Sequence, residues 1–145
     1  MKNILIGLSL FLLLLLASCQ PSTVTYKGGE GSTIKVSGSS HDWCAAGATV
    51  DINSQQGQLA SKVIGKETIT IGSTSVETCH SISELGGVGG AGTVESWASQ
   101  DGKSSKTVYN VNGEKSITES WENNGKHCIK TAIEGQPEGA YEQCG

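Results

Sequence analysis

The hydrophobic positions of this 145-residue chain follow two different patterns. Residues 4–16 form one apolar run, which is rich in Leu and contains Gly7 and Ser9. After residue 31 apolar and polar positions alternate instead, and Val, Ile and Thr replace Leu. A period of two is typical of β-strands, and β-branched side chains favour the pleated surface of a sheet. The pattern therefore predicts a short apolar leader followed by one β domain.

The alternation predicts two groups of strands. The first group lies near residues 32–38, 47–53, 58–64, 67–72 and 76–82. The second is a four-strand meander near residues 93–99, 104–111, 115–122 and 127–134, whose turns are Asp101-Gly102, Asn112-Gly113 and Asn124-Gly125. Such dipeptides supply the positive φ angles that two-residue hairpin turns require. We expect a mainly β fold, an antiparallel meander sheet of curved or half-barrel form, with little helix apart from the leader.

A glycine-rich segment, residues 85–92, separates the two groups. It contains the pattern G-x-G-x-x-G at Gly87, Gly89 and Gly92. A dinucleotide site requires this pattern between a strand and a helix, whereas residues 93–97 alternate like a strand. We therefore interpret the segment as a flexible linker or wide loop and expect no nucleotide cofactor.

The predicted turns also fix which residues of the meander lie opposite one another. Trp97 lies opposite Lys106, which lies opposite Glu119, and Trp121 lies opposite Cys128. One face of the meander thus alternates Lys and Glu beside the two tryptophans, while the other carries Ser, Thr, Val and Ile. Desolvating an ionic row costs more than burying hydroxyl groups that can bond one another. We expect the Ser/Thr/Val/Ile face to form the core and the tryptophans to lie on the wetter face.

The two tryptophans suggest a candidate ligand face, composed of Trp97, Trp121, Lys106 and Glu119. They end two similar segments 24 residues apart, Val94–Trp97 and Thr118–Trp121. Exposed indole rings among charged groups could stack against a sugar or an amphipathic ligand. Alternatively, Trp121 covers a disulfide of Cys128, Trp97 packs on the stem of Lys106, and a nearby loop covers both.

The leader has the features of an export signal. Its apolar run of 13 residues follows Lys2 and is shorter than the roughly 20 residues that span a bilayer. Leu16-Ala17-Ser18-Cys19 resembles the lipobox of prokaryotic lipoproteins, which implies cleavage before Cys19 and acylation of that residue, palmitate included. We expect a signal peptide (1–18), a lipidated anchor and linker (19–31) and a disulfide-bonded β domain (32–145). Gln20 favours the outer membrane or cell surface over the inner membrane, and an ordinary secretory signal with an incidental Cys19 is the alternative.

Composition narrows the function classes. Beyond residue 18 there are nine Lys and 14 acidic residues, and the chain has no Arg, the usual reader of phosphate and guanine. This balance argues against a nucleic-acid partner. The same part has only two Leu and no Phe, so its core is thin. Because no nucleophile elbow, P-loop or zincin motif occurs, we expect no enzyme activity and no cofactor.

Four cysteines remain after Cys19, namely Cys44, Cys79, Cys128 and Cys144. An even number in an exported domain predicts two disulfides. Of the three pairings we favour the sequential one, Cys44–Cys79 and Cys128–Cys144.

Every histidine of the chain lies near one of these cysteines, so a metal site is the alternative. His41, His80 and His127 could bind zinc or copper if they gathered in space. Adjacent residues of a strand point to opposite faces, however, and an oxidising compartment removes free thiols. We therefore expect no metal.

The lipobox together with a short β domain resembles the small envelope lipoproteins of bacteria and archaea. The hairpin-rich half is loosely similar to the lipoprotein-carrier (LolA-like) superfamily, in which a curved antiparallel sheet cradles a lipid chain. The resemblance implies a membrane-anchored binding or scaffold module of the cell envelope, with an envelope protein or glycan as partner. Lipid or lipoprotein carriage and metal handling are the alternatives.

Overall fold

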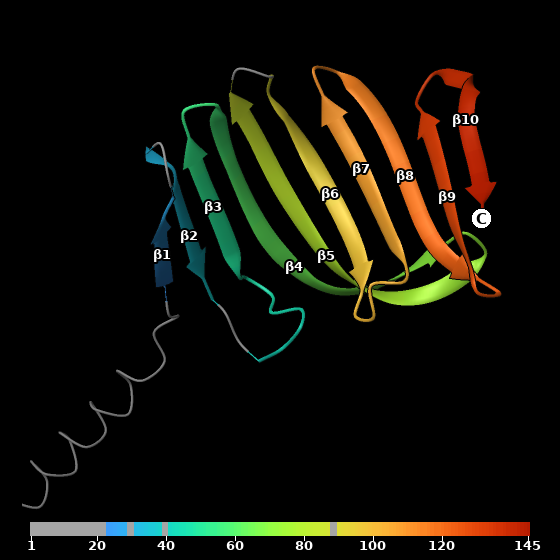
Figure 1. The fold of residues 1–145 in the computed structure, drawn as a ribbon, viewed down its shortest axis with the longest axis horizontal. Helices are drawn as coiled ribbons and strands as arrows, with labels where there is room; N and C mark the ends of the chain where they lie inside the picture. Colours follow the sequence, from blue (N-terminus) through green and yellow to red (C-terminus); the bar gives the residue numbers. More distant parts are fainter. Residues whose placement is uncertain (1–22, 29–30, 39–40, 88–89) are drawn as a thin grey trace, which may run out of the picture.

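The computed structural model shows one open sheet of ten antiparallel strands (Figure 1). It describes residues 23–28, 31–38, 41–87 and 90–145. The leader and Cys19 lie outside these residues. The predicted fold class, a mainly β antiparallel meander, is confirmed. In the described part of the chain, no helix has the length and apolar character needed to cross a bilayer.

The strands are arranged in the sheet in the order in which they occur along the chain. They are β1 (Thr23–Lys27), β2 (Thr33–Ser37), β3 (Thr49–Ser54), β4 (Gly57–Ile71), β5 (Thr74–Gly87), β6 (Gly92–Ser99), β7 (Ser105–Val111), β8 (Glu114–Asn123), β9 (Lys126–Ile133) and β10 (Gln136–Cys144).

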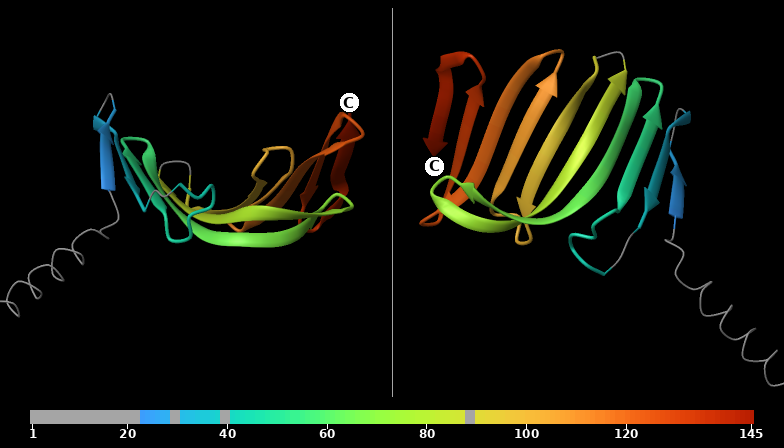
Figure 2. Two further views of the ribbon diagram at one scale, coloured as in Figure 1. Left: turned by 90° about the horizontal axis from the view of Figure 1, so that it is seen from below. Right: turned by 180° about the vertical axis from the view of Figure 1, so that it is seen from behind.

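The sheet is curved into a trough, and the long β4–β5 hairpin crosses its outer side (Figure 2). The hairpin departs from the plane of its neighbours at a β-bulge, where the pairing register shifts between Val63 and Gly65. Gly65 has a φ of +144°, a conformation that favours glycine. We call the face that carries Trp97 and Trp121 the outer face and the opposite one the inner face.

The predicted register of the meander is correct. Trp97 pairs with Lys106, Lys106 with Glu119, and Trp121 with Cys128. Asn112 and Asn124 have φ angles of 55° and 52°, as the two Asn-Gly turns require.

The Asp101-Gly102 connection differs from the predicted two-residue turn. It is a wider loop in which the Ser99 N–H donates to the Ser104 carbonyl at 2.9 Å. Asp101 Oδ1 closes this loop by accepting hydrogen bonds from the Ser99 hydroxyl at 2.6 Å and from the Lys103 N–H at 3.0 Å. The β6–β7 register is unchanged, because the pairing ends earlier in β6 and begins later in β7 by the same number of residues.

Several strand boundaries differ from those predicted. The strands expected at 58–64 and 67–72 form the single strand β4, and its turn lies at Gly72, where φ is +61°. The charged pair Lys66-Glu67 resembles a connection in the sequence but belongs to the extended hairpin. The segment interpreted as a glycine-rich loop is partly strand, because β5 continues to Gly87.

The sequence predicts the two edge strands unequally. β1 lies inside the segment predicted as anchor and linker, whose end the sequence allows to form a first short strand and turn, whereas β10 is absent from the predicted strands. Pro137 and Gly139 interrupt any alternation in β10, so the sequence carries no strand signal there. The edges of the sheet are therefore harder to recognise than its centre.

The expected position of the core is wrong. The buried hydrophobic residues of the described chain are Cys44, Ile71, Trp121 and Cys128. Trp121 and Cys128 belong to the outer face, and Ile71 reaches them from the β4–β5 hairpin. This hairpin is long enough to fold over the outer face, which two short strands could not do. No second layer covers the inner face among the described residues.

The predicted disulfide pairing is confirmed. Cys44–Cys79 joins the loop between β2 and β3 to β5, and Cys128–Cys144 joins β9 to β10. They close segments of 35 and 16 residues. On the chain-entropy account each contributes about 3 kcal/mol, which is substantial for a sheet with so small a core.

Candidate functional site

The inner face of the trough carries two apolar rows that run across the strands. The first row crosses the five neighbouring strands β1 to β5, and its members are Tyr26, Ile34, Ile52, Leu59 and Leu85. On β6 the corresponding position is Gly92, and Val111 on β7 continues the row. The second extends from β1 to β9, and its members are Val24, Val36, Val50, Ser61, Ser83, Val94, Tyr109, Ser116 and Ile133. Neither row contains a charged residue as far as β7; on β8, Glu114 follows Val111 in the first row.

These rows are open to solvent. Of the seven exposed large hydrophobic residues of the described chain, six lie on the inner face: Val24, Tyr26, Tyr109, Ile129, Ile133 and Tyr141. The seventh, Ile64, lies at the β-bulge. The six inner-face residues form two groups, one on β1 and one on β7 to β10, and the rows between them are partly exposed. Exposed apolar surface of this kind is typical of interaction sites.

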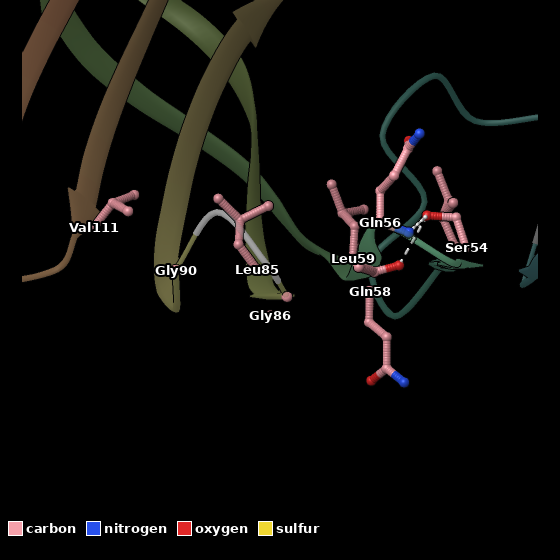
Figure 3. Close-up of a pocket in the computed structure, with 11 residues that line it drawn as sticks. Ser54, Gln56, Gln58, Leu59, Leu85, Gly86, Gly90 and Val111 are labelled. Atoms are coloured by element: carbon pink, nitrogen blue, oxygen red, sulfur yellow. Dashed lines mark hydrogen bonds between the residues drawn. The ribbon is translucent and has the colours of Figure 1, made fainter.

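A pocket of about 400 Å³ lies at one end of the inner face (Figure 3). Ile52, Leu59, Leu85 and Val111 supply its apolar lining, and Gly86, Gly87 and Gly90 also border it. A Cβ added at Gly87 would lie 2.6 Å from Gly57 Cα, so only glycine permits this close approach. A second cavity of about 420 Å³ shares Val111 and continues past Tyr109 to Ile133, and the charged residues Glu114 and Lys115 also border it. Both volumes fall in the range of small-molecule sites.

Hydroxyl groups are interspersed among the apolar rows and lie beyond them on the inner face. Ser83 donates to Ser61 at 3.0 Å, the Ser105 and Ser120 hydroxyls are 2.9 Å apart, and those of Thr118 and Thr131 are 3.5 Å apart. The inner face therefore combines an apolar part with a neutral hydroxyl part. Such a surface suits an amphipathic molecule.

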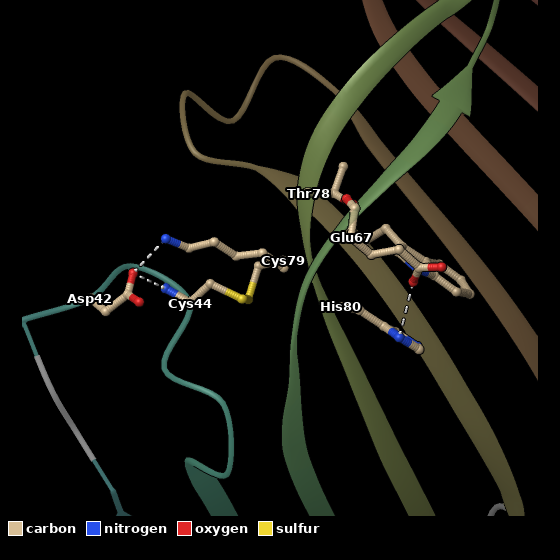
Figure 4. Close-up of a disulfide and its surroundings, with 8 residues drawn as sticks. Asp42, Cys44, Glu67, Thr78, Cys79 and His80 are labelled. Carbon is tan, nitrogen blue, oxygen red and sulfur yellow. Dashed lines mark hydrogen bonds and ion pairs between the residues drawn. A yellow bond between two sulfur atoms is a disulfide. The ribbon is translucent and has the colours of Figure 1, made fainter.

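The outer face has a different character, centred on His80 and Trp97. The two rings are stacked, with centroids 4.5 Å apart and an angle of 12° between their planes. Glu67 Oε2 accepts a hydrogen bond from Trp97 Nε1 at 2.9 Å and lies 3.4 Å from His80 Nδ1 (Figure 4). Glu95 Oε2 lies 3.7 Å from His80 Nε2. Two carboxylates therefore flank one largely buried imidazole.

Sequence reasoning misses the position of Glu67 in this group. Glu67 is 30 residues from Trp97, and the alternation places it in a short separate strand. The bulge in β4 brings it beside His80, and no signal in the sequence fixes that register shift. The sequence singles out His80 only as a neighbour of Cys79.

The structure keeps three members of the candidate ligand face, Trp97, Lys106 and Glu119, in one cross-strand row and covers the fourth, Trp121. Lys106 Nζ and Glu119 Oε1 form an ion pair at 3.3 Å in the outer row. Trp121 is only 9% exposed and lies against the hairpin turn, where a Cβ on Gly72 would come within 2.8 Å of the indole. Trp121 thus covers buried Cys128, as the alternative interpretation expects. Trp97 stacks on His80, and Lys106 is its cross-strand partner.

The three histidines considered as metal ligands lie on different parts of the fold. His41 is in the loop after β2, His80 is on β5, and His127 is on β9. Within the described ranges, no three His, Cys, Asp or Glu residues gather to hold a metal ion. The four cysteines of the domain form disulfides and offer no thiolate.

The loop that carries Cys44 is attached to β4 by charge and to β5 by its disulfide. Asp42 Oδ1 lies 3.1 Å from Lys66 Nζ and accepts a hydrogen bond from the Cys44 N–H at 3.3 Å (Figure 4). The same ammonium group lies 5.5 Å from the centre of the Trp43 ring. Hydrogen bonding to Lys66 and to the Cys44 N–H holds the pKa of Asp42 below its ordinary value.

Comparisons with protein-family models, with curated proteins and with solved structures each found no match to this chain.

Proposed function

We propose that the protein is a binding module of the cell envelope, anchored by lipid at Cys19, whose inner face takes an amphipathic ligand with an acyl chain. The observation that carries this proposal is the location of six of the seven exposed large hydrophobic residues of the described chain on one uncovered face. The predicted export signal, the lipobox resemblance and the two disulfides support the envelope as its location.

The dimensions of the first apolar row support an acyl chain as the bound group. From Tyr26 to Leu85 the row crosses five strands, a span of about 19 Å at the usual spacing between neighbouring strands. An extended fatty acyl chain has a comparable length. Each methylene buried in such a row contributes about 0.8 kcal/mol, and the neighbouring hydroxyls can bond a polar head.

This proposal selects among the functions that the sequence leaves open. Because Trp121 is covered and the four residues of the candidate ligand face do not form one open platform, a glycan stacked on the two tryptophans has less support. The neutral character of the apolar rows favours an apolar group over a charged envelope protein. Lipid carriage, an alternative at the outset, therefore has the stronger physical basis.

The test measures binding of an environment-sensitive fluorescent fatty acid. We would use the C19S chain, so that the protein's own acyl groups cannot occupy the inner face. Leu59, which lines the pocket in the first apolar row, and Ile64 at the bulge lie on the same strand, β4, which makes them a matched pair. We expect L59K to weaken binding at least tenfold and I64K to change it less than twofold. Equal losses in the two variants, or no binding by the parent chain, would contradict the proposal.

A further inference from the structure

The two edges of the sheet differ in their protection against pairing with another strand. β10 contains Pro137, which has no N–H to donate, and its pairing with β9 is irregular between Gln136 and Tyr141. Its last residue, Cys144, is also tied to β9 by a disulfide. Prolines and bulges of this kind are devices that keep an edge strand from adding a further strand.

β1 has none of these devices among its described residues. All five of its residues are exposed, and all five pair with β2 in uninterrupted register. Its sequence, Thr-Val-Thr-Tyr-Lys, is rich in residues that favour strands, with one charge at its end. No described residue pairs with the other side of β1, which therefore presents a regular backbone edge.

The orientation of the free backbone groups of β1 follows from its turn. The Gly28 N–H donates to the Ser32 carbonyl at 2.9 Å, which makes this a hydrogen-bonded pair of the β1–β2 ladder. Hydrogen-bonded pairs alternate along an antiparallel ladder, so Tyr26 and Val24 also direct their backbone groups to β2. The N–H and C=O groups of Thr23, Thr25 and Lys27 consequently point outward from the sheet.

We propose that two copies of this chain associate by antiparallel pairing of their β1 strands, centred on Thr25. In this register Thr25 pairs with its own copy, and Thr23 pairs with Lys27 of the partner subunit. All three outward-facing residues of each strand then exchange both backbone hydrogen bonds, which gives about six bonds across the symmetry axis.

The side chains fit the same register. On the inner face Val24 lies opposite Tyr26 of the partner subunit, so the apolar rows of the two sheets join into one surface. On the outer face Thr25 meets Thr25 of the partner subunit, and no two like charges are opposed. A second copy matches this edge without any adjustment, which is the argument for a homodimer over an unrelated strand. The interface is independent of whether the inner face holds a ligand.

Engineered cysteines in the full-length, membrane-anchored chain test the register. In the proposed dimer the two Thr25 Cα atoms are about 5.5 Å apart, within the range of a disulfide. The two Val24 Cα atoms are offset by two residues and lie beyond that range. We expect T25C to give at least ten times more disulfide-linked dimer than V24C on non-reducing gels. Equal yields, a monomeric T25C, or a T25C adduct with a different protein would overturn the proposal.

A charge introduced at the centre of the interface provides the second test. In a chain with both V24C and Y26C, whose thiols would face each other across the dimer, we would add T25E or T25V. Within its own sheet, the carboxylate introduced by T25E would lie opposite Lys35, and this attraction favours the β1–β2 pair. In the dimer the same carboxylate would lie opposite the second copy's carboxylate, and this repulsion disfavours association. T25E should lower the cross-linked fraction at least fivefold, and T25V should leave it unchanged. Loss in both variants, or in neither, would contradict β1 pairing.

Discussion

Truncation of Ile71 provides the most direct test of how the hairpin is held on the outer face. Ile71 has no exposed surface and contacts Trp121 and Cys128, which form the core cluster with it. Replacing a buried Ile by Ala costs about 2–5 kcal/mol, through lost burial and the cavity left behind. Because domains of this size are stable by about 5–15 kcal/mol, I71A should remove a large share of the total.

Urea unfolding, followed by tryptophan fluorescence, measures this loss. With an m-value of about 2 kcal/mol per molar urea, a loss of about 3 kcal/mol lowers the midpoint by about 1.5 M. I129A is the control, because Ile129 is 39% exposed on the inner face and should shift the midpoint by less than about 0.5 M. Emission from Trp121 should also move to longer wavelength in I71A. Similar midpoint shifts in the two variants would show that the packing around Trp121 is not the main core.

The remaining predictions concern the turn, the disulfides and the loop ion pair. G72A should lower the urea midpoint, because residue 72 has a positive φ and its Cβ would meet the indole of Trp121; an unchanged midpoint would contradict this close packing. The double variant C128S/C144S should lose about 3 kcal/mol in the same assay, and retention of parental stability would argue against a structural role for this bridge. The pKa of Asp42 is lowered in the folded protein, so its contribution to stability is present above the ordinary value of 3.8 and is lost as the pH falls through the lowered pKa. D42N should therefore be less stable than the parent chain near neutral pH and equal to it in strong acid; a difference that persists in acid would contradict this.

The centre of the sheet is predictable because local chemistry determines it. Asn112-Gly113 and Asn124-Gly125 fix two turns through their backbone preferences, and the turns fix every cross-strand pair between them. The cysteine pairing can be predicted for a related reason, because the sequential pairing closes the shortest loops. These features depend on residues that are close in the chain.

The core and the candidate site depend on features that the sequence does not show. The β-bulge near Gly65 joins two predicted strands into one and sends Ile71 across the outer face to Trp121. Burial of the Trp121 face therefore follows from a distant hairpin and not from its own polarity pattern. The sequence correctly places the residues of the Ser/Thr/Val/Ile face together on one side of the meander. It does not tell whether a second protein layer or a ligand covers that face, because the apolar pattern is the same in both cases.

The order of the strands has a consequence for how such a protein can change in evolution. Every strand pairs only with its neighbours in the chain, so inserting a hairpin of two strands leaves all other pairs intact. Such an insertion also preserves the strand direction and the face of every later side chain, whereas a single added strand would reverse the direction of those that follow. Val94–Trp97 and Thr118–Trp121 are separated by one hairpin unit, as a duplication of this kind would leave them. The sheet can thus widen in steps of two strands, and each step would lengthen the apolar trough without redesign of the rest.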